Sequence, residues 1–135
     1  MPETFTPESR AIFAKRALAH IATVDESGQP FVSPVWVELD GDNVVFNTAL
    51  GRAKARHVAN DPRVALSLTD PDDPPVVIAV RGTVVGFTTK GADETIDRLA
   101  HKYTGHPTFQ GRAPGDVRVN VVIRPDRIAR QPGAD

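Results

Sequence analysis

The sequence predicts a mostly β protein, an antiparallel barrel of six strands with two or three short helices. Six segments are rich in β-branched and aromatic residues. Most of them are joined by short turns, which only antiparallel neighbours permit, whereas parallel strands need long crossovers. Antiparallel strands with few helices favour a barrel over an open parallel sheet. With 135 residues and no repeat or linker, the chain is predicted to be a single domain, residues 1–135.

The N-terminal half is predicted to hold one helix and three strands. Thr6 followed by Pro7 is typical of a helix start, with a hydroxyl at the cap and proline in the first turn. Turn-forming residues around Gly28 and Gly41 separate alternating segments that are predicted to pair as a three-strand meander. The predicted strands cover residues 18–24, 31–39 and 44–48.

The C-terminal half is predicted to hold two helices and three strands. The alanine- and arginine-rich segment 51–60 is predicted to be helical and to end before Pro62. A second amphipathic helix is predicted at 92–103, followed by a loop at 104–115 and, after Pro125, by a loosely held tail. The predicted strands are 64–69, 76–87, which Gly82 interrupts, and 117–123.

Composition excludes several functions. With 16 basic and 17 acidic residues the formal net charge is −1, so no general field attracts nucleic acid or an anionic membrane. The chain has no cysteine, which excludes disulfides and thiolate chemistry and predicts a cytoplasmic protein. No apolar run approaches a membrane span, and no signal peptide is expected. The four histidines show no metal-ligand spacing, so no metal site is predicted.

Three cations, Arg52, Lys54 and Arg56, stand where the segment 44–48 gives way to a predicted helix. A helix N-terminus is itself partly positive, so these side chains are unfavourable there unless an anion neutralises them. A phosphate resolves the conflict, because it accepts hydrogen bonds from both basic side chains and free backbone N–H groups. The alternative is a solvated helix surface in an arginine-rich chain.

The segment Ser33, Pro34, Val35 and Trp36 breaks a plain strand pattern. Proline cannot donate to a strand ladder, so the backbone here is predicted to be locally unpaired and able to meet a ligand ring. The alternative is that Trp36 is a core aromatic and Pro34 marks a sheet edge.

Taken together, the chain resembles the pyridoxamine-phosphate-oxidase-like family of FMN-binding split β-barrels, and within it the branch of reductases that depend on the deazaflavin coenzyme F420. The resemblance extends from about residue 10 to about residue 128. KYTG at 102–105 resembles the F420 branch in particular. The other matching segments are IATV at 21–24, GQP at 28–30, VSPVW at 32–36, FNT at 46–48, GRAKAR at 51–56, DPRV at 61–64 and RGT at 81–83.

The resemblance implies a homodimer that holds its cofactor in a groove between subunits. It implies that the three cations take the cofactor's phosphate and acidic tail, that residues 33–36 lie along its ring, and that Asn47, Thr48 and Ala49 line the ring's edge. His57 stands where relatives often have asparagine. The abundance of arginine relative to lysine fits an actinobacterial source. Because F420 is common in such organisms, this favours F420 over FMN as the cofactor.

The predicted function is a reductase that transfers a hydride from reduced F420 to a conjugated small-molecule acceptor. Such chemistry needs no protein nucleophile, because the cofactor carries the hydride. Tyr103, just before the loop with His106 and Phe109, is the candidate proton donor, or else a buried helix-face aromatic. Two alternatives remain: an FMN-dependent enzyme resembling pyridoxamine-phosphate oxidase, and a carrier that binds a flavin or deazaflavin without turnover.

Overall fold

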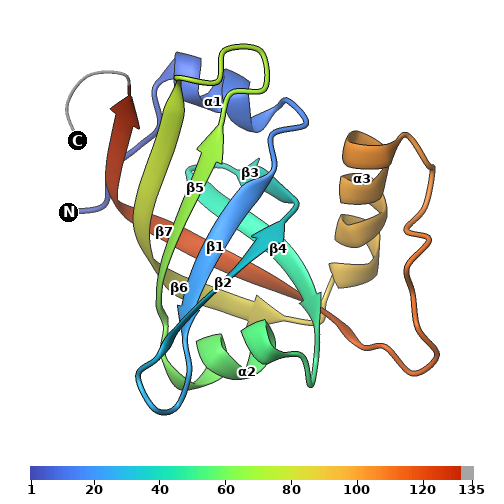
Figure 1. Cartoon of the computed structure of the whole chain (residues 1–135). Coiled ribbons are helices and arrows are strands. Elements are labelled where there is room, and N and C mark those ends of the chain that lie inside the picture. Colours follow the sequence, from blue (N-terminus) through green and yellow to red (C-terminus); the bar gives the residue numbers. More distant parts are fainter. Residues whose placement is uncertain (132–135) are drawn as a thin grey trace.

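The computed structural model describes residues 1–131 and confirms a mostly β, antiparallel architecture with three helices (Figure 1). One curled sheet has the strand order β2-β1-β5-β6-β7-β4-β3. The strands are β1 (Ala19–Val24), β2 (Pro30–Val35), β3 (Val37–Asp40), β4 (Asn43–Ala49), β5 (Arg63–Thr69), β6 (Val77–Thr88) and β7 (Arg118–Gln131). The helices are α1 (Pro7–Phe13), α2 (Ala53–Asn60) and α3 (Ala92–Thr104).

The sheet has seven strands rather than the predicted six, because the predicted strand 31–39 is two strands. β2 ends at Val35 and β3 begins at Val37, so Trp36 alone joins them. β2 pairs only with β1 and β3 only with β4, at opposite edges of the sheet. The predicted three-strand meander is therefore wrong. A single residue carries the chain from one edge of the curled sheet to the other, which is how the barrel is split.

β6 and β7 form the longest ladder, from Val77 opposite Gln131 to Thr88 opposite Asn120. The predicted interruption at Gly82 is confirmed, since the register shifts between Arg81 and Gly82. A Cβ on Gly82 would lie 2.8 Å from the Arg124 carbonyl, so only glycine fits this close approach.

The tail after Pro125 was predicted to be loosely held, and up to Gln131 this is wrong. It continues β7 along the whole of β6. The N-terminal segment also holds it, because Glu3 N donates to the Pro125 carbonyl at 3.0 Å. Residues 126–131 are mostly polar and do not alternate with apolar residues, so their own sequence does not predict a strand. They are extended because β6 is long enough to pair with them.

The helices cover the ends and one side of the barrel (Figure 1). α1 begins as predicted, with the Thr6 hydroxyl accepting a hydrogen bond from Ser9 N at 3.2 Å. α3 carries acids in its first turn and His101 and Lys102 in its last, and Gly105 ends it with a φ of 81°.

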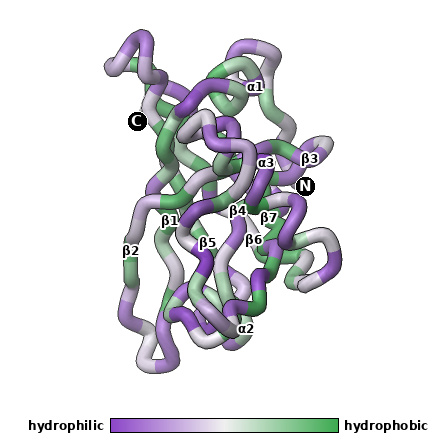
Figure 2. Tube along the Cα trace, turned by 90° about the vertical axis from the view of Figure 1, so that its right-hand side faces the viewer, coloured by the Kyte–Doolittle hydropathy of each residue, from purple (hydrophilic) through white to green (hydrophobic). Residues whose placement is uncertain are grey.

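The core fills the inside of the curl with apolar side chains that alternate along the strands. Ile21, Phe46, Ile78 and Val121 come from four strands and are fully buried. Hydrophobic stretches accordingly recur along the strands (Figure 2). This core occupies the inside of the curl, and pockets lie at its rim and on the outer face of the sheet.

Candidate functional site

A pocket of about 290 Å³ lies where the split in the barrel, the start of α2 and the side of α3 meet. Its lining combines cations, an amide and a hydroxyl with apolar and aromatic side chains. The predicted site residues Pro34, Val35, Trp36, Asn47, Thr48, Arg52 and Lys54 line it. The structure adds Leu18, Ile96, Leu99, Phe109 and Arg118. Such a mixture suits a planar ligand with an anionic group.

Lys54 is the central cation of this pocket. Its Nζ donates to the hydroxyl of Ser33 on β2 at 3.0 Å. Burial, together with the nearby Arg52 guanidinium, lowers the pKa of the Lys54 ammonium. Within residues 1–131, neither Lys54 nor Arg52 has a carboxylate close enough for an ion pair. A partly buried lysine without a counter-ion is costly, and an anion removes the cost.

The start of α2 adds to this positive potential. Arg52 occupies the N-cap with no side-chain cap, and the first turn has no acidic residue. The free N–H groups of the first turn are therefore left for water or a ligand.

Arg118 is a third cation in the pocket, and it is not among the predicted site residues. Its side chain is only 6% exposed. Nε donates to Asn47 Oδ1 at 2.9 Å, and Nη1 lies 3.6 Å from Asp116 Oδ2. Burial lowers its pKa, and Asp116 acts in the opposite direction. Arg118 opens β7 opposite Ala49, so a pairing between distant segments brings it beside the helix start.

An aromatic group forms the other part of the lining. The ring of Trp36 is stacked on Tyr103 at 5.5 Å with an interplanar angle of 9°, and Phe109 meets it edge-on at 6.0 Å. The Phe109 ring also lies over the Arg118 guanidinium, at 5.1 Å. Trp36 is thus held between α3 and the segment that follows it.

Asn47, Thr48 and Ala49 occupy the end of β4. Asn47 Nδ2 donates to the Ala92 carbonyl at 2.8 Å and to Asn120 Oδ1 at 2.9 Å. Its Oδ1 accepts from Arg118, so one amide aligns α3, β7 and the guanidinium. Thr48 lines the pocket, whereas Ala49 is buried.

Two predicted residues of α2 lie outside the pocket lining. Arg56 Nη1 donates to the Gly51 carbonyl at 2.6 Å on the exposed surface. His57 is buried, with Nδ1 2.8 Å from Thr23 Oγ1 and its ring edge-on to Phe31 at 5.4 Å. Both side chains brace α2 against the neighbouring backbone and strands.

Tyr103 directs its hydroxyl into the fold. The hydroxyl donates to the Ala17 carbonyl at 2.7 Å and accepts from Val37 N at 3.3 Å. Burial raises its pKa. Next to it, Lys102 Nζ donates to the carbonyls of Phe13 and, at 2.7 Å, of Val37. The two residues fasten α3 to the split in the barrel.

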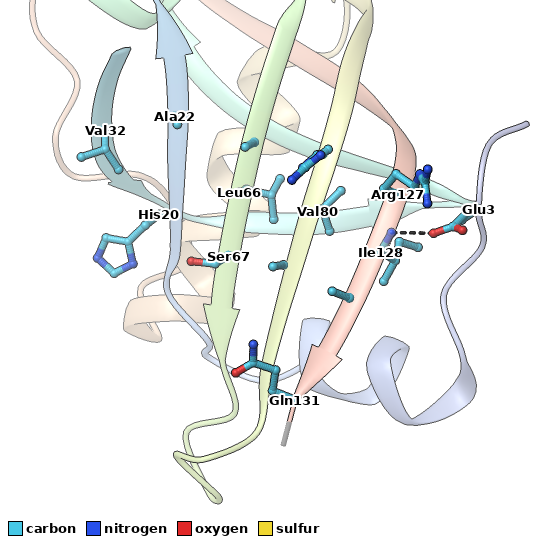
Figure 3. Close-up of a pocket in the computed structure, with 14 residues that line it drawn as sticks. Glu3, His20, Ala22, Val32, Leu66, Ser67, Val80, Arg127, Ile128 and Gln131 are labelled. Carbon is cyan, nitrogen blue, oxygen red and sulfur yellow. Dashed lines mark hydrogen bonds between the residues drawn. The ribbon is translucent and has the colours of Figure 1, made fainter. Parts of the chain in front are cut away.

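A second, larger groove of about 740 Å³ runs over the outer face of the sheet (Figure 3). Small side chains surround Arg81 in the groove, where Arg81 pairs opposite Ala65, and Val32 lies at one end and Arg127 and Glu3 at the other (Figure 3). The small residues are Ala22, Ala65, Ser67, Ala79 and Ala129. No helix of the described residues covers this face (Figure 1).

Neither a cluster of metal ligands nor a helix long and apolar enough for a membrane occurs in the described part of the chain. Within residues 1–131, no three His, Cys, Asp or Glu side chains lie close enough together to hold a metal ion. In the same residues, no helix combines the length and the hydropathy that a membrane span requires.

Comparison with protein families gives one match that covers nearly the whole chain. A model described as pyridoxamine 5'-phosphate oxidase matches residues 5–131. Among curated proteins, the pyridoxine/pyridoxamine 5'-phosphate oxidase of Citrobacter koseri is 47% identical over 47 residues, which are 34% of this chain and 22% of that enzyme. That of Baumannia cicadellinicola is 36% identical over 63 residues, 46% of this chain and 29% of that enzyme. The chain therefore aligns with less than a third of the length of these relatives.

Solved structures match over the full chain. An F420 reductase superposes with a TM-score of 0.79 and 29% identity, over 96% of this chain and 98% of that one. A conserved hypothetical protein of Mycobacterium tuberculosis superposes with a TM-score of 0.75 and 20% identity, over 96% of this chain and 85% of that one. HupZ of Group A Streptococcus superposes with a TM-score of 0.69 and 23% identity, over 94% of each chain. The last two show a shared fold.

Proposed function

The chain belongs to the pyridoxamine 5'-phosphate oxidase family, and from that premise we propose that it is an oxidoreductase dependent on the deazaflavin coenzyme F420. The proposed reaction transfers a hydride from the reduced cofactor to a conjugated small-molecule acceptor. The observation that carries the proposal is Lys54, a partly buried ammonium beside Arg52 that has no carboxylate partner in the described chain and shares a pocket with Trp36.

The residues of the pocket fit a phosphate-bearing flavin or deazaflavin. Arg52 and Lys54 would hold the phosphate, with Ser33 fixing the position of the ammonium. Trp36 and the backbone of β2 would lie along the ring, and Asn47 and Thr48 at its edge. Arg56, outside the pocket, is assigned to the acidic tail that F420 has and FMN lacks. His57 supports α2 from beneath.

The cofactor supplies the hydride chemistry, and the protein supplies binding, orientation and shelter from water. Asn47 keeps Arg118 and α3 in register beside the ligand. Because the Tyr103 hydroxyl already donates to Ala17, we assign the proton to solvent rather than to Tyr103.

FMN is the second candidate cofactor, because the curated relatives are named oxidases and a phosphate alone would satisfy Arg52 and Lys54. F420 is favoured because the F420 reductase matches this chain over its full length.

The decisive experiment titrates the purified protein with F420 and, separately, with FMN, following quenching of Trp36, the single tryptophan. The proposal expects F420 to bind more tightly than FMN, and Lys54→Ala to weaken both. Arg56→Met should weaken only F420, since only that ligand reaches it. A preference for FMN would move the protein to the oxidase alternative, and binding without turnover across an acceptor screen would leave a carrier.

We further propose that the protein is a homodimer and that the outer groove receives the second copy. The small side chains around Arg81 leave room for a second sheet to approach this face, and Val32, 63% exposed, offers apolar surface at its edge (Figure 3). Ala65→Arg places a second long cation opposite Arg81, which adds bulk and like-charge repulsion in the middle of this face, and should yield a monomer by sedimentation. Glu26→Arg, in the exposed β1–β2 turn, is the matched control and should stay dimeric. A monomeric wild type would overturn the proposal.

A further inference from the structure

The Arg118 guanidinium has more donors than its protein partners use. Of its five N–H groups, Nε bonds to Asn47, while Nη1 is 3.6 Å from Asp116, beyond hydrogen-bond distance. Within residues 1–131, neither Nη atom makes a hydrogen bond. Among the described residues no buried side-chain N or O atom lacks a partner, so the Nη atoms of this largely buried side chain reach the open pocket, where water or an anionic ligand can accept from them.

Phe109 stands where that group would bind. Its ring lies over the guanidinium at 5.1 Å and also meets Trp36 edge-on. A cation–π contact is weaker than the bidentate pair that a guanidinium forms with a carboxylate or phosphate. An oxyanion can therefore displace the ring from Arg118.

The segment that carries Phe109 is fastened from outside rather than from within the pocket. Asp97 on α3 accepts from Phe109 N at 2.9 Å and from Arg112 Nη2 at 2.9 Å. Asp93 accepts from Arg112 Nη1 at 2.8 Å, on the exposed side of the helix. These bonds hold the backbone of the segment, and none of them involves the ring. Gly111 packs against the ring, because a Cβ there would lie 2.7 Å from Phe109 Cζ.

We propose that Phe109 covers an oxyanion subsite on Arg118, and that a planar ligand places its carboxylate or phosphate there when the ring moves aside. The inference rests on the proposed function only in treating this pocket as the ligand site. Arg52 and Lys54 already provide for one phosphate, so Arg118 adds capacity for a second ionised group. The acceptor is accordingly an acid, a conjugated carboxylate whose flat part lies against Trp36, or else a second anionic group of the cofactor binds here.

The test uses calorimetric titration with benzoate, its neutral analogue benzamide, and inorganic phosphate. Phe109→Ala should tighten benzoate binding at least fivefold and leave benzamide unchanged, because the gain comes from uncovering a charge. In the Phe109→Ala background, Arg118→Lys should weaken benzoate about tenfold, while Lys90→Met, which removes an exposed cation outside the pocket, should not.

Tighter binding of either benzoate or phosphate supports the subsite, and the anion that responds shows whether the acceptor or the cofactor supplies the oxyanion. Tightening for benzoate assigns it to the acceptor's carboxylate, and tightening for phosphate alone assigns it to the cofactor. The side-chain Nε–H resonance of Arg118 should shift on binding, which a merely structural arginine would not show. Unchanged or weaker binding of both anions in Phe109→Ala overturns the inference. Failure of F420 and FMN to bind the wild type, with benzoate still bound, would overturn the proposed function and leave the subsite.

Discussion

Lys54 and Lys102 are both partly buried lysines, and burial lowers the pKa of each, yet their surroundings differ. Lys102 donates to two backbone carbonyls and lies 4.8 Å from the centre of the Tyr103 ring, so its ammonium has partners within the protein. Lys54 has one hydroxyl partner and a neighbouring cation that repels it. The difference teaches that a perturbed lysine identifies a ligand site only where its donors lack partners within the protein.

The largest expected effect is on stability, from Lys102→Met. The Phe13 carbonyl would lose the Lys102 donor and the Val37 carbonyl would keep only the longer contact with the Tyr103 hydroxyl at 3.4 Å, at a cost of about 2 kcal/mol. Thermal unfolding should move down by roughly 5–10 °C. Lys90→Met, at an exposed position, is the control and should leave the melting temperature unchanged. Equal melting temperatures for the two variants would erase the distinction between the lysines.

Next in size is the effect of Lys54→Met on ligand binding. Losing one charge-assisted contact should weaken FMN or F420 by about 10- to 100-fold, as calorimetry would show. The melting temperature of the free protein should stay the same or rise, because an uncompensated buried charge is removed. A variant that melts lower and binds normally would assign Lys54 to the structure instead.

The smallest expected effect is a pH dependence of stability that belongs to Lys102. Burial lowers the pKa of its ammonium to about 8 in the folded protein, below that of the unfolded chain. Between those two values the unfolded state binds more protons, so stability rises with pH. The neutral amine still has two N–H groups for its two carbonyls.

Denaturant unfolding at pH 7 and at pH 10 measures this dependence. Relative to Lys102→Met, the wild type should gain on the order of 1 kcal/mol at the higher pH, after allowance for solvent screening. The lowered pKa is contradicted if the difference in free energy of unfolding between the wild type and Lys102→Met is the same at pH 7 and pH 10. It is also contradicted if that difference changes in favour of the variant.

Features that depend on neighbouring residues could be predicted from the sequence, and features that depend on distant pairing could not. Thr6 and Pro7 start α1 as expected, because capping is a local interaction. The division of 31–39 at Trp36 was missed, since only the positions of β1 and β4 put its two halves at opposite edges.

The site shows the same division. Arg52 and Lys54 could be identified from their place before a helix. Arg118 could not, because only the pairing of Ala49 with Arg118 brings it to them. The long β7 was missed for a related reason, since its polar second half is ordered by β6 and by Glu3.

The position of β7 in the sheet also bears on how the protein is made. β7 lies between β6 and β4 and is the last strand of the described chain to leave the ribosome. Until it emerges, the hairpin of β3 and β4 has no neighbour, and the nascent chain exposes two unpaired edges. Closure of the sheet must therefore await synthesis of almost the whole domain, which makes slow closure the expectation and chaperone protection of the growing chain an advantage.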